Sequence, residues 1–192
     1  PLHGTRWTIA ARPLVHRVPC SGYVLAEPER PGVFHPERAR ALGVPEGKAW
    51  GRLQRGETVD GVRPEQVCDP RRPGRKLVLL GDTNDASAIV EAGRGCDVLV
   101  CEATYLTDRA AKAATWGHLT ADQTGALAAR MQARQLIVTH FSSRYTTDAT
   151  VGTDPVLAEA AAACPATTVF AADDLLRFAI GVDGTLARVV GG

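Results

Sequence analysis

The sequence predicts an α/β fold, and three features predict it. Short apolar runs at residues 77–80, 98–100 and 136–138 are each bounded by turn signals, which favours strands covered on both faces. Helical patterns separate these runs, so the order is strand, helix, strand. Each run ends in polar residues, among them Asp82, Glu102 and His140. Because ligands of α/β sheets gather at the carboxyl ends of strands, we expect these side chains and His118 to converge.

The first part of the chain predicts two strands and a short helix. Residues 7–11 alternate weakly, and residues 22–25 form a second strand-like run. Residues 28–32 read Pro-Glu-Arg-Pro-Gly, which is a turn pattern. Residues 36–42 predict a helix that has Pro36 at its first position and Gly43 after its end.

Residues 43–75 predict an irregular, basic excursion on the surface, with a short strand or two. The segment is rich in Gly, Pro and Arg and shows little periodicity. Its basic residues include Arg52, Arg55, Arg63, Arg71, Arg72 and Arg75. Two interpretations stay open here: a solvated loop, or a patch that faces a polyanion.

Residues 76–192 predict strand–helix repeats that end in a hairpin. Helices are expected near residues 86–92, 106–115 and 154–163, and a strand at 168–171. Another helix begins at Thr120, because Thr120 and Gln123 match a capping box. Residues 175–180 and 185–190 predict the hairpin. The 192 residues are enough for one domain with a substantial core, so we expect a single domain over 1–192.

The composition limits the possible partners and compartments. The formal net charge is +1, so nucleic acid binding would need a local basic patch. Five cysteines without a C-x-x-C pair indicate reduced thiols, and hence a cytoplasmic protein. No apolar run approaches the roughly 18 residues of a membrane span, so we expect no membrane partner.

Three residues from distant parts of the chain have the composition of a zinc site: His16, Asp82 and His140. A carboxylate at the edge of a buried sheet is costly unless a cation or donors accompany it. The alternatives are a helix cap for Asp82, a half-buried surface histidine for His16 and a structural histidine for His140.

Glu102 and His118 form a candidate proton-relay pair. A carboxylate that accepts from one imidazole nitrogen raises the basicity of the other, and such a histidine can protonate a leaving group. The alternative is an ion pair that ties a loop to a strand.

Five segments, in this order, resemble the ribonuclease Z family, a tRNA 3′-processing endonuclease family in the metallo-β-lactamase superfamily. They are residues 14–24 (LVHRVPCSGYV), Gly81-Asp82-Thr83, Cys101-Glu102-Ala103-Thr104, Gly117-His118-Leu119-Thr120 and Thr139-His140-Phe141-Ser142-Ser143-Arg144-Tyr145. The resemblance covers almost the whole chain. It implies the C-terminal portion of a metallo-β-lactamase-like αββα sandwich.

The resemblance also implies roles for individual residues. His16 and His140 would each bind a zinc ion, and Asp82 would bridge two zinc ions. Glu102 and His118 would form the proton relay, although Cys101 and Leu119 depart from the His and Ser of the family pattern. Substrate phosphate contacts are expected from a further set: Thr83, Ser142, Ser143 and Arg144. The expected substrate is precursor tRNA, and the expected assembly is a homodimer.

The H-x-H-x-D-H motif of the family does not occur in the sequence. The chain begins with Pro1 and not with Met, so we interpret it as the back portion of a longer protein. We therefore expect it to be inactive alone. Two alternatives remain: a hydrolase of the same fold that acts on a small ester or another phosphodiester, and a non-catalytic fragment that needs a partner half.

Overall fold

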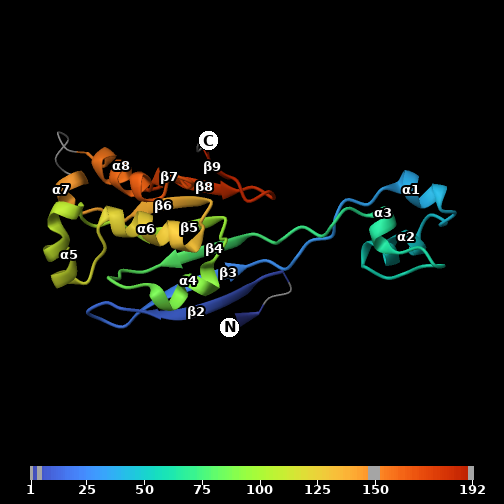
Figure 1. Cartoon of the computed structure of the whole chain (residues 1–192), viewed down its shortest axis with the longest axis horizontal. Helices are drawn as coiled ribbons and strands as arrows, with labels where there is room; N and C mark the ends of the chain where they lie inside the picture. Colours follow the sequence, from blue (N-terminus) through green and yellow to red (C-terminus); the bar gives the residue numbers. More distant parts are fainter. Residues whose placement is uncertain (1, 4–5, 147–151, 190–192) are drawn as a thin grey trace. The chain divides into compact units, whose positions relative to one another are not determined.

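A computed structural model describes residues 2–3, 6–146 and 152–189 of the chain. Its main element is a seven-stranded mixed sheet in the order β1 to β7 (Figure 1). The strands are β1 (Leu2–His3), β2 (Thr8–Leu14), β3 (Cys20–Ala26), β4 (Lys76–Leu80), β5 (Val98–Glu102), β6 (Gln135–Thr139) and β7 (Thr168–Ala171). Neighbours from β1 to β4 pair antiparallel, and β4 to β7 pair parallel. The α/β fold is therefore confirmed.

Helices follow the strands of the parallel half. After β4 come a 3-10 helix η1 (Ser87–Ile89) and α4 (Val90–Gly93); after β5 come η2 (Thr107–Arg109), α5 (Ala110–Trp116) and α6 (Ala121–Met131). After β6 come α7 (Ser143–Thr146) and α8 (Asp154–Ala163). The predicted capping box opens α6, with Gln123 accepting from the N–H of Thr120 at 3.0 Å. The predicted hairpin is β8 (Arg177–Ile180) with β9 (Leu186–Val189).

The main core lies between the sheet and the helices α4, α6 and α8, which pack on one face of it (Figure 1). Val24, Val78, Leu99 and Leu136 are register partners in neighbouring strands, and all four are buried. Burial of such side chains contributes about 1.5–3 kcal/mol each, so this row alone is a large part of the stability of the fold.

The opposite face of the sheet is open along β3 and β4. Tyr23 and Leu79 are register partners there, and they are 46% and 39% exposed. The expectation of strands covered on both faces is therefore correct for β5 and β6 but wrong for β4. The hairpin contributes Phe178, whose ring contacts that of Phe170 on β7 with centroids 5.9 Å apart.

The chain divides into two compact units: residues 1–26 with 75–192, and residues 27–74. The smaller unit contains α1 (Pro36–Ala41), α2 (Lys48–Gln54) and α3 (Pro64–Val67), and a core of its own. The core residues are Ala39, Val44, Leu53, Val59, Val62 and Val67. The excursion at 43–75 thus holds helices and isolated bridges, not the expected short strands, because this apolar cluster orders it. That residues 1–192 act as one domain stays a prediction.

Candidate functional site

The candidate site lies where β4, β5 and β6 end. Asp82 comes two residues after β4, Glu102 is the last residue of β5, and His140 follows β6 directly. The three strands pair in parallel, so their carboxyl ends share one edge of the sheet. His118 reaches this edge from the turn between α5 and α6. The predicted convergence is confirmed: the ligand atoms of Asp82, Glu102, His118 and His140 all lie within 4.8 Å of one another.

Glu102 is the centre of the hydrogen bonding at this edge, although its side chain is only 2% exposed. Its Oε1 accepts from the backbone N–H of Thr83 at 2.8 Å, and its Oε2 accepts from that of Leu119 at 3.3 Å. The Thr104 hydroxyl donates to Oε2, and His118 Nδ1 lies 3.0 and 3.1 Å from the two oxygens. Both oxygens of this buried carboxylate therefore have donors, which offset the loss of its contacts with water.

The hydrogen bonds of the three site histidines fix which ring nitrogen is free. His118 Nδ1 faces a carboxylate and His16 Nδ1 faces the Gly117 carbonyl oxygen at 2.8 Å, so each must donate. His140 Nδ1 lies 2.9 Å from Thr104 Oγ1. Because the Thr104 hydroxyl hydrogen goes to the charged acceptor Glu102, its oxygen accepts from His140. In each ring, Nε2 therefore keeps a free lone pair, which is the arrangement of metal-binding histidines.

Asp82 and His140 fit a bound cation. His140 Nε2 lies 3.6 Å from Asp82 Oδ2, and both atoms are acceptors when the histidine is neutral. Two acceptors at this separation repel each other unless a proton or a metal ion lies between them. Two ligand atoms about 2.1 Å from a tetrahedral zinc ion lie about 3.4 Å apart. The observed separation is close to that spacing, so this pair is compatible with a shared metal ion.

His140 has left-handed backbone geometry, with φ at 56°. A non-glycine residue seldom adopts this conformation, and its cost is about 1–3 kcal/mol. Two hydrogen bonds hold the turn: His140 Nδ1 donates to Thr104 Oγ1 at 2.9 Å, and the Ser142 N–H donates to the Thr104 carbonyl at 3.2 Å. The left-handed turn at His140 ends β6 and directs the imidazole toward the site.

His16 reaches the same edge from the loop between β2 and β3. Its ring centroid lies 5.1 Å from that of His118, and the His118 centroid lies 5.1 Å from that of His140. Gly117 makes this approach possible: its φ is +79°, and a Cβ atom there would lie 2.8 Å from His16 Nδ1. His16 does not belong to the tight group of four, so its role as a metal ligand stays a prediction.

The four expected phosphate contacts differ in their surroundings. Thr83 is buried, and its hydroxyl lies 2.8 Å from the Asp85 carbonyl oxygen and 3.0 Å from that of Val15, so hydrogen bonds within the protein occupy it. Ser142 is half-buried, while Ser143 and Arg144 at the start of α7 are exposed. Ser142, Ser143 and Arg144 are thus at least partly accessible to a ligand, whereas the side chain of Thr83 is buried.

The two departures from the family pattern leave the relay pair intact. Cys101 is buried in the main core, so the replaced residue lies on the other side of β5 from Glu102. Burial raises the pKa of the Cys101 thiol, which keeps it neutral. Leu119 contributes its backbone N–H to Glu102, which any residue other than proline can do.

Sequence reasoning gave no role to Thr104, which links Glu102 to His140. Its position two residues after Glu102 is a weak signal, because only the fold shows that β6 brings His140 beside it. Tyr145 was also unassigned; it is buried and its hydroxyl accepts from the Leu106 N–H at 3.2 Å. Thr104 and Tyr145 thus stabilise the site through hydrogen bonds.

Comparisons with known proteins identify relatives of this chain. A family model described as "Beta-lactamase superfamily domain" matches residues 48–141. Ribonuclease Z of Myxococcus xanthus is 46% identical over 138 residues, which are 69% of this chain and 45% of that protein. Ribonuclease Z of Thermosynechococcus vestitus is 40% identical over 185 residues, which are 94% of this chain and 45% of that protein.

Solved structures share the fold. The human tRNase Z short form has a TM-score of 0.53 at 20% identity, over 90% of this chain and 43% of that one. The metallo-beta-lactamase fold protein YhfI of Bacillus subtilis has a TM-score of 0.56 at 15% identity, over 98% of this chain and 52% of that one. These likenesses confirm the metallo-β-lactamase-like fold.

The match is partial in one respect, since the chain spans about half the length of the curated relatives it matches. In the described part of the chain, no helix has the length and apolar character needed to cross a bilayer. The family model, the identities with curated relatives and the shared fold lead to one assignment: the chain belongs to the ribonuclease Z family of the β-lactamase superfamily.

Proposed function

We propose that this chain is the C-terminal portion of a zinc-dependent endoribonuclease that removes the 3′ trailer of precursor tRNA. One observation carries the proposal: Glu102 bonds both His118 and Thr104, and Thr104 bonds His140 beside Asp82. A proton donor and a candidate metal-binding pair are thereby held in one network. The curated relatives named Ribonuclease Z supply the substrate class.

Asp82, His140 and His16 would hold zinc in this proposal, through one carboxylate and two free Nε2 atoms. When bound, two zinc ions would supply an activated water molecule and positive charge beside the scissile phosphate. The sequence holds no H-x-H-x-D-H motif, so it carries only part of the ligand set that the family uses. We therefore expect the isolated 192 residues to be inactive.

His118 acts as the proton donor in the proposed reaction. The attacking water loses a proton to solvent as its oxygen forms a bond to phosphorus, the bond from phosphorus to the 3′ oxygen breaks, and Nε2 of protonated His118 gives its proton to that oxygen. Glu102 holds Nδ1–H and stabilises the cationic ring during the cycle. Because Glu102 is buried, little water screens its interaction with His118.

Ser142, Ser143 and Arg144 would contact the phosphate oxygens. A guanidinium beside a scissile phosphate offsets the charge that builds on these oxygens. Thr83 is not used for a phosphate contact in this proposal, because its hydroxyl bonds to carbonyl oxygens and its N–H donates to Glu102. The proposed location is the cytoplasm, which rests on the reduced cysteines. The proposed assembly is a homodimer, as the family resemblance implies.

The test uses a chimera in which the unmatched front part of the Myxococcus xanthus relative precedes this chain. The chimera should cut precursor tRNA after the unpaired nucleotide that follows the acceptor stem and leave a 3′ hydroxyl. His118→Ala should lower the rate about 10²–10⁴-fold. On a p-nitrophenyl phosphodiester, whose leaving group needs no proton, the same variant should lose far less.

The result that contradicts the proposal is equal loss on both substrates, because a proton donor matters only for the poor leaving group. The rival of the same fold is a hydrolase of small esters or other phosphodiesters. A chimera that hydrolyses the generic diester and leaves precursor tRNA intact would favour this rival. The second rival, a non-catalytic fragment that needs a partner half, predicts that the isolated 192 residues cut neither substrate, and cleavage by them alone would exclude it.

A further inference from the structure

Two pairs of a cation and an aromatic ring border His118. The Arg17 guanidinium lies over the Trp116 ring, with Cζ 4.6 Å from the centroid. The Lys112 ammonium lies 5.3 Å from the centroid of Tyr105, and the Tyr105 ring contacts the His118 ring edge-on at 6.3 Å. Proteins that bind single-stranded nucleic acid commonly combine cations, which attract the phosphates, with aromatic rings, on which the bases stack.

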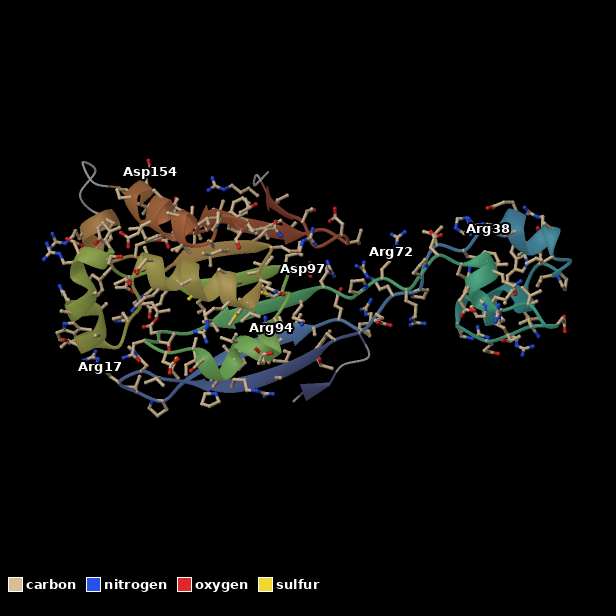
Figure 2. The ribbon with its side chains drawn as sticks, viewed as in Figure 1. Arg17, Arg38, Arg72, Arg94, Asp97 and Asp154 are labelled. Atoms are coloured by element: carbon tan, nitrogen blue, oxygen red, sulfur yellow. The ribbon has the colours of Figure 1, made fainter. Side chains whose placement is uncertain are left out.

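The fold holds the Arg17–Trp116 pair next to the site. Arg17 follows His16 on the loop between β2 and β3, near α5 in Figure 2. Trp116 ends α5 and precedes the left-handed Gly117. The Trp116 side chain is exposed to solvent, whereas the His118 side chain is largely covered by the site. The hydrogen bond from His16 to the Gly117 carbonyl joins the two loops at 2.8 Å. The pair is thus part of the rim of the site.

The pair is open to a ligand. Trp116 is 45% exposed, and Val15 and Val18 beside Arg17 are also exposed. Arg17 has no carboxylate partner among the residues that the structure describes, so its charge is not neutralised there. A large exposed aromatic ring under a planar cation offers a base two surfaces for stacking, and it offers a phosphate one charge.

We propose that Arg17 and Trp116 stack against the unpaired nucleotide that carries the leaving 3′ oxygen. The inference rests on the proposed function, in which His118 protonates that oxygen. The base attached to this sugar lies on the His118 side of the cleaved bond, where the Arg17–Trp116 pair is found. An unpaired base can leave the helix stack and lie on an aromatic ring, whereas a paired base cannot. Arg17 and Trp116 would then be positioning residues.

The experiment measures binding of an RNA hairpin to the 192-residue chain. The hairpin copies an acceptor stem and carries 2-aminopurine at the unpaired position after the stem, followed by a short trailer. Stacking should quench the fluorescence of wild-type complexes. Trp116→Ala should bind roughly tenfold more weakly and lose the quenching. Trp116→Phe should keep most of both, and Arg17→Ala should weaken binding with a smaller dependence on salt.

Trp7→Ala is the matched control. Trp7 is 40% exposed, and it precedes β2, whereas Arg17 follows the other end of that strand. The Trp7→Ala variant should bind the hairpin as tightly as the wild type does. A second hairpin carries 2-aminopurine in its loop instead, and its fluorescence should not change with any variant. If Trp116 had only a structural role, Trp116→Ala would affect both probes alike.

Wild-type affinity and quenching in Trp116→Ala would overturn the inference, and so would an equal loss in Trp7→Ala. The outcome is separable from that of the proposed function. If the chimera cuts precursor tRNA and Trp116→Ala leaves its KM unchanged, the stacking inference alone is wrong. If the chimera never cuts precursor tRNA, the proposed function is wrong, whatever Trp116 binds.

Discussion

Replacing Glu102 by Gln tests the centre of the site without changing its shape. The carboxylate accepts from the N–H groups of Thr83 and Leu119, from the Thr104 hydroxyl and from His118. An amide has one oxygen and one NH₂ group, so any orientation points NH₂ at one side of this set of donors. At least one N–H group then loses its acceptor inside the protein.

The magnitude follows from these contacts. A hydrogen bond to a charged group contributes about 1.5–3 kcal/mol, and a buried donor without a partner costs about 1–3 kcal/mol. We expect Glu102→Gln to lower the free energy of unfolding by about 3–5 kcal/mol, a large part of the about 5–15 kcal/mol of a typical domain. With a slope of about 2 kcal/mol per M, the urea midpoint falls by about 2 M.

The assay is urea unfolding of the 192-residue chain, followed by far-UV circular dichroism. Glu91→Gln is the control, since it removes the charge of a carboxylate that forms an exposed ion pair with Arg94. Such pairs contribute little, so its midpoint should stay near that of the wild type. Equal midpoints for the two variants would refute the reasoning that Glu102 is a charged acceptor for buried donors.

Further predictions concern the metal, the thiols and cleavage. His140→Ala in the chimera should abolish cleavage of precursor tRNA and lower the zinc content measured by mass spectrometry; a fully active variant would remove this residue from the metal site. The isolated chain should bind well under two zinc ions, and two tightly bound ions would contradict the partial ligand set. Cys101→Ala should leave cleavage intact, because the thiol lies in the core. Burial raises the pKa of Cys96 to about 12 and raises that of Cys101 too, so both thiols stay protonated below that range. At pH 8 iodoacetamide should therefore modify them only after unfolding, and rapid labelling of the folded chain would count against their burial.

Several features of the site could be predicted from the sequence because they depend on neighbours along the chain. The apolar runs before Gly81, Cys101 and Thr139 predict strands, and all three are strands with polar residues at their ends. The rule that parallel strands end at one edge of the sheet then predicts the convergence of Asp82, Glu102, His118 and His140, which is confirmed. The capping box at Thr120 is equally local, and it is also confirmed.

Other features depend on contacts between residues far apart in the chain, so only the tertiary structure decided them. His16 and Gly117 are 101 residues apart, and the hydrogen bond between them brings the β2–β3 loop to the site. Thr104 gained its role only because β6 places His140 beside it. The left-handed conformation of His140 has only a weak local signal, since histidine adopts it more often than most residues but far less often than glycine. Patterns along the chain specify where strands end and which chemical groups follow them, whereas the pairing of those groups depends on packing of the whole sheet.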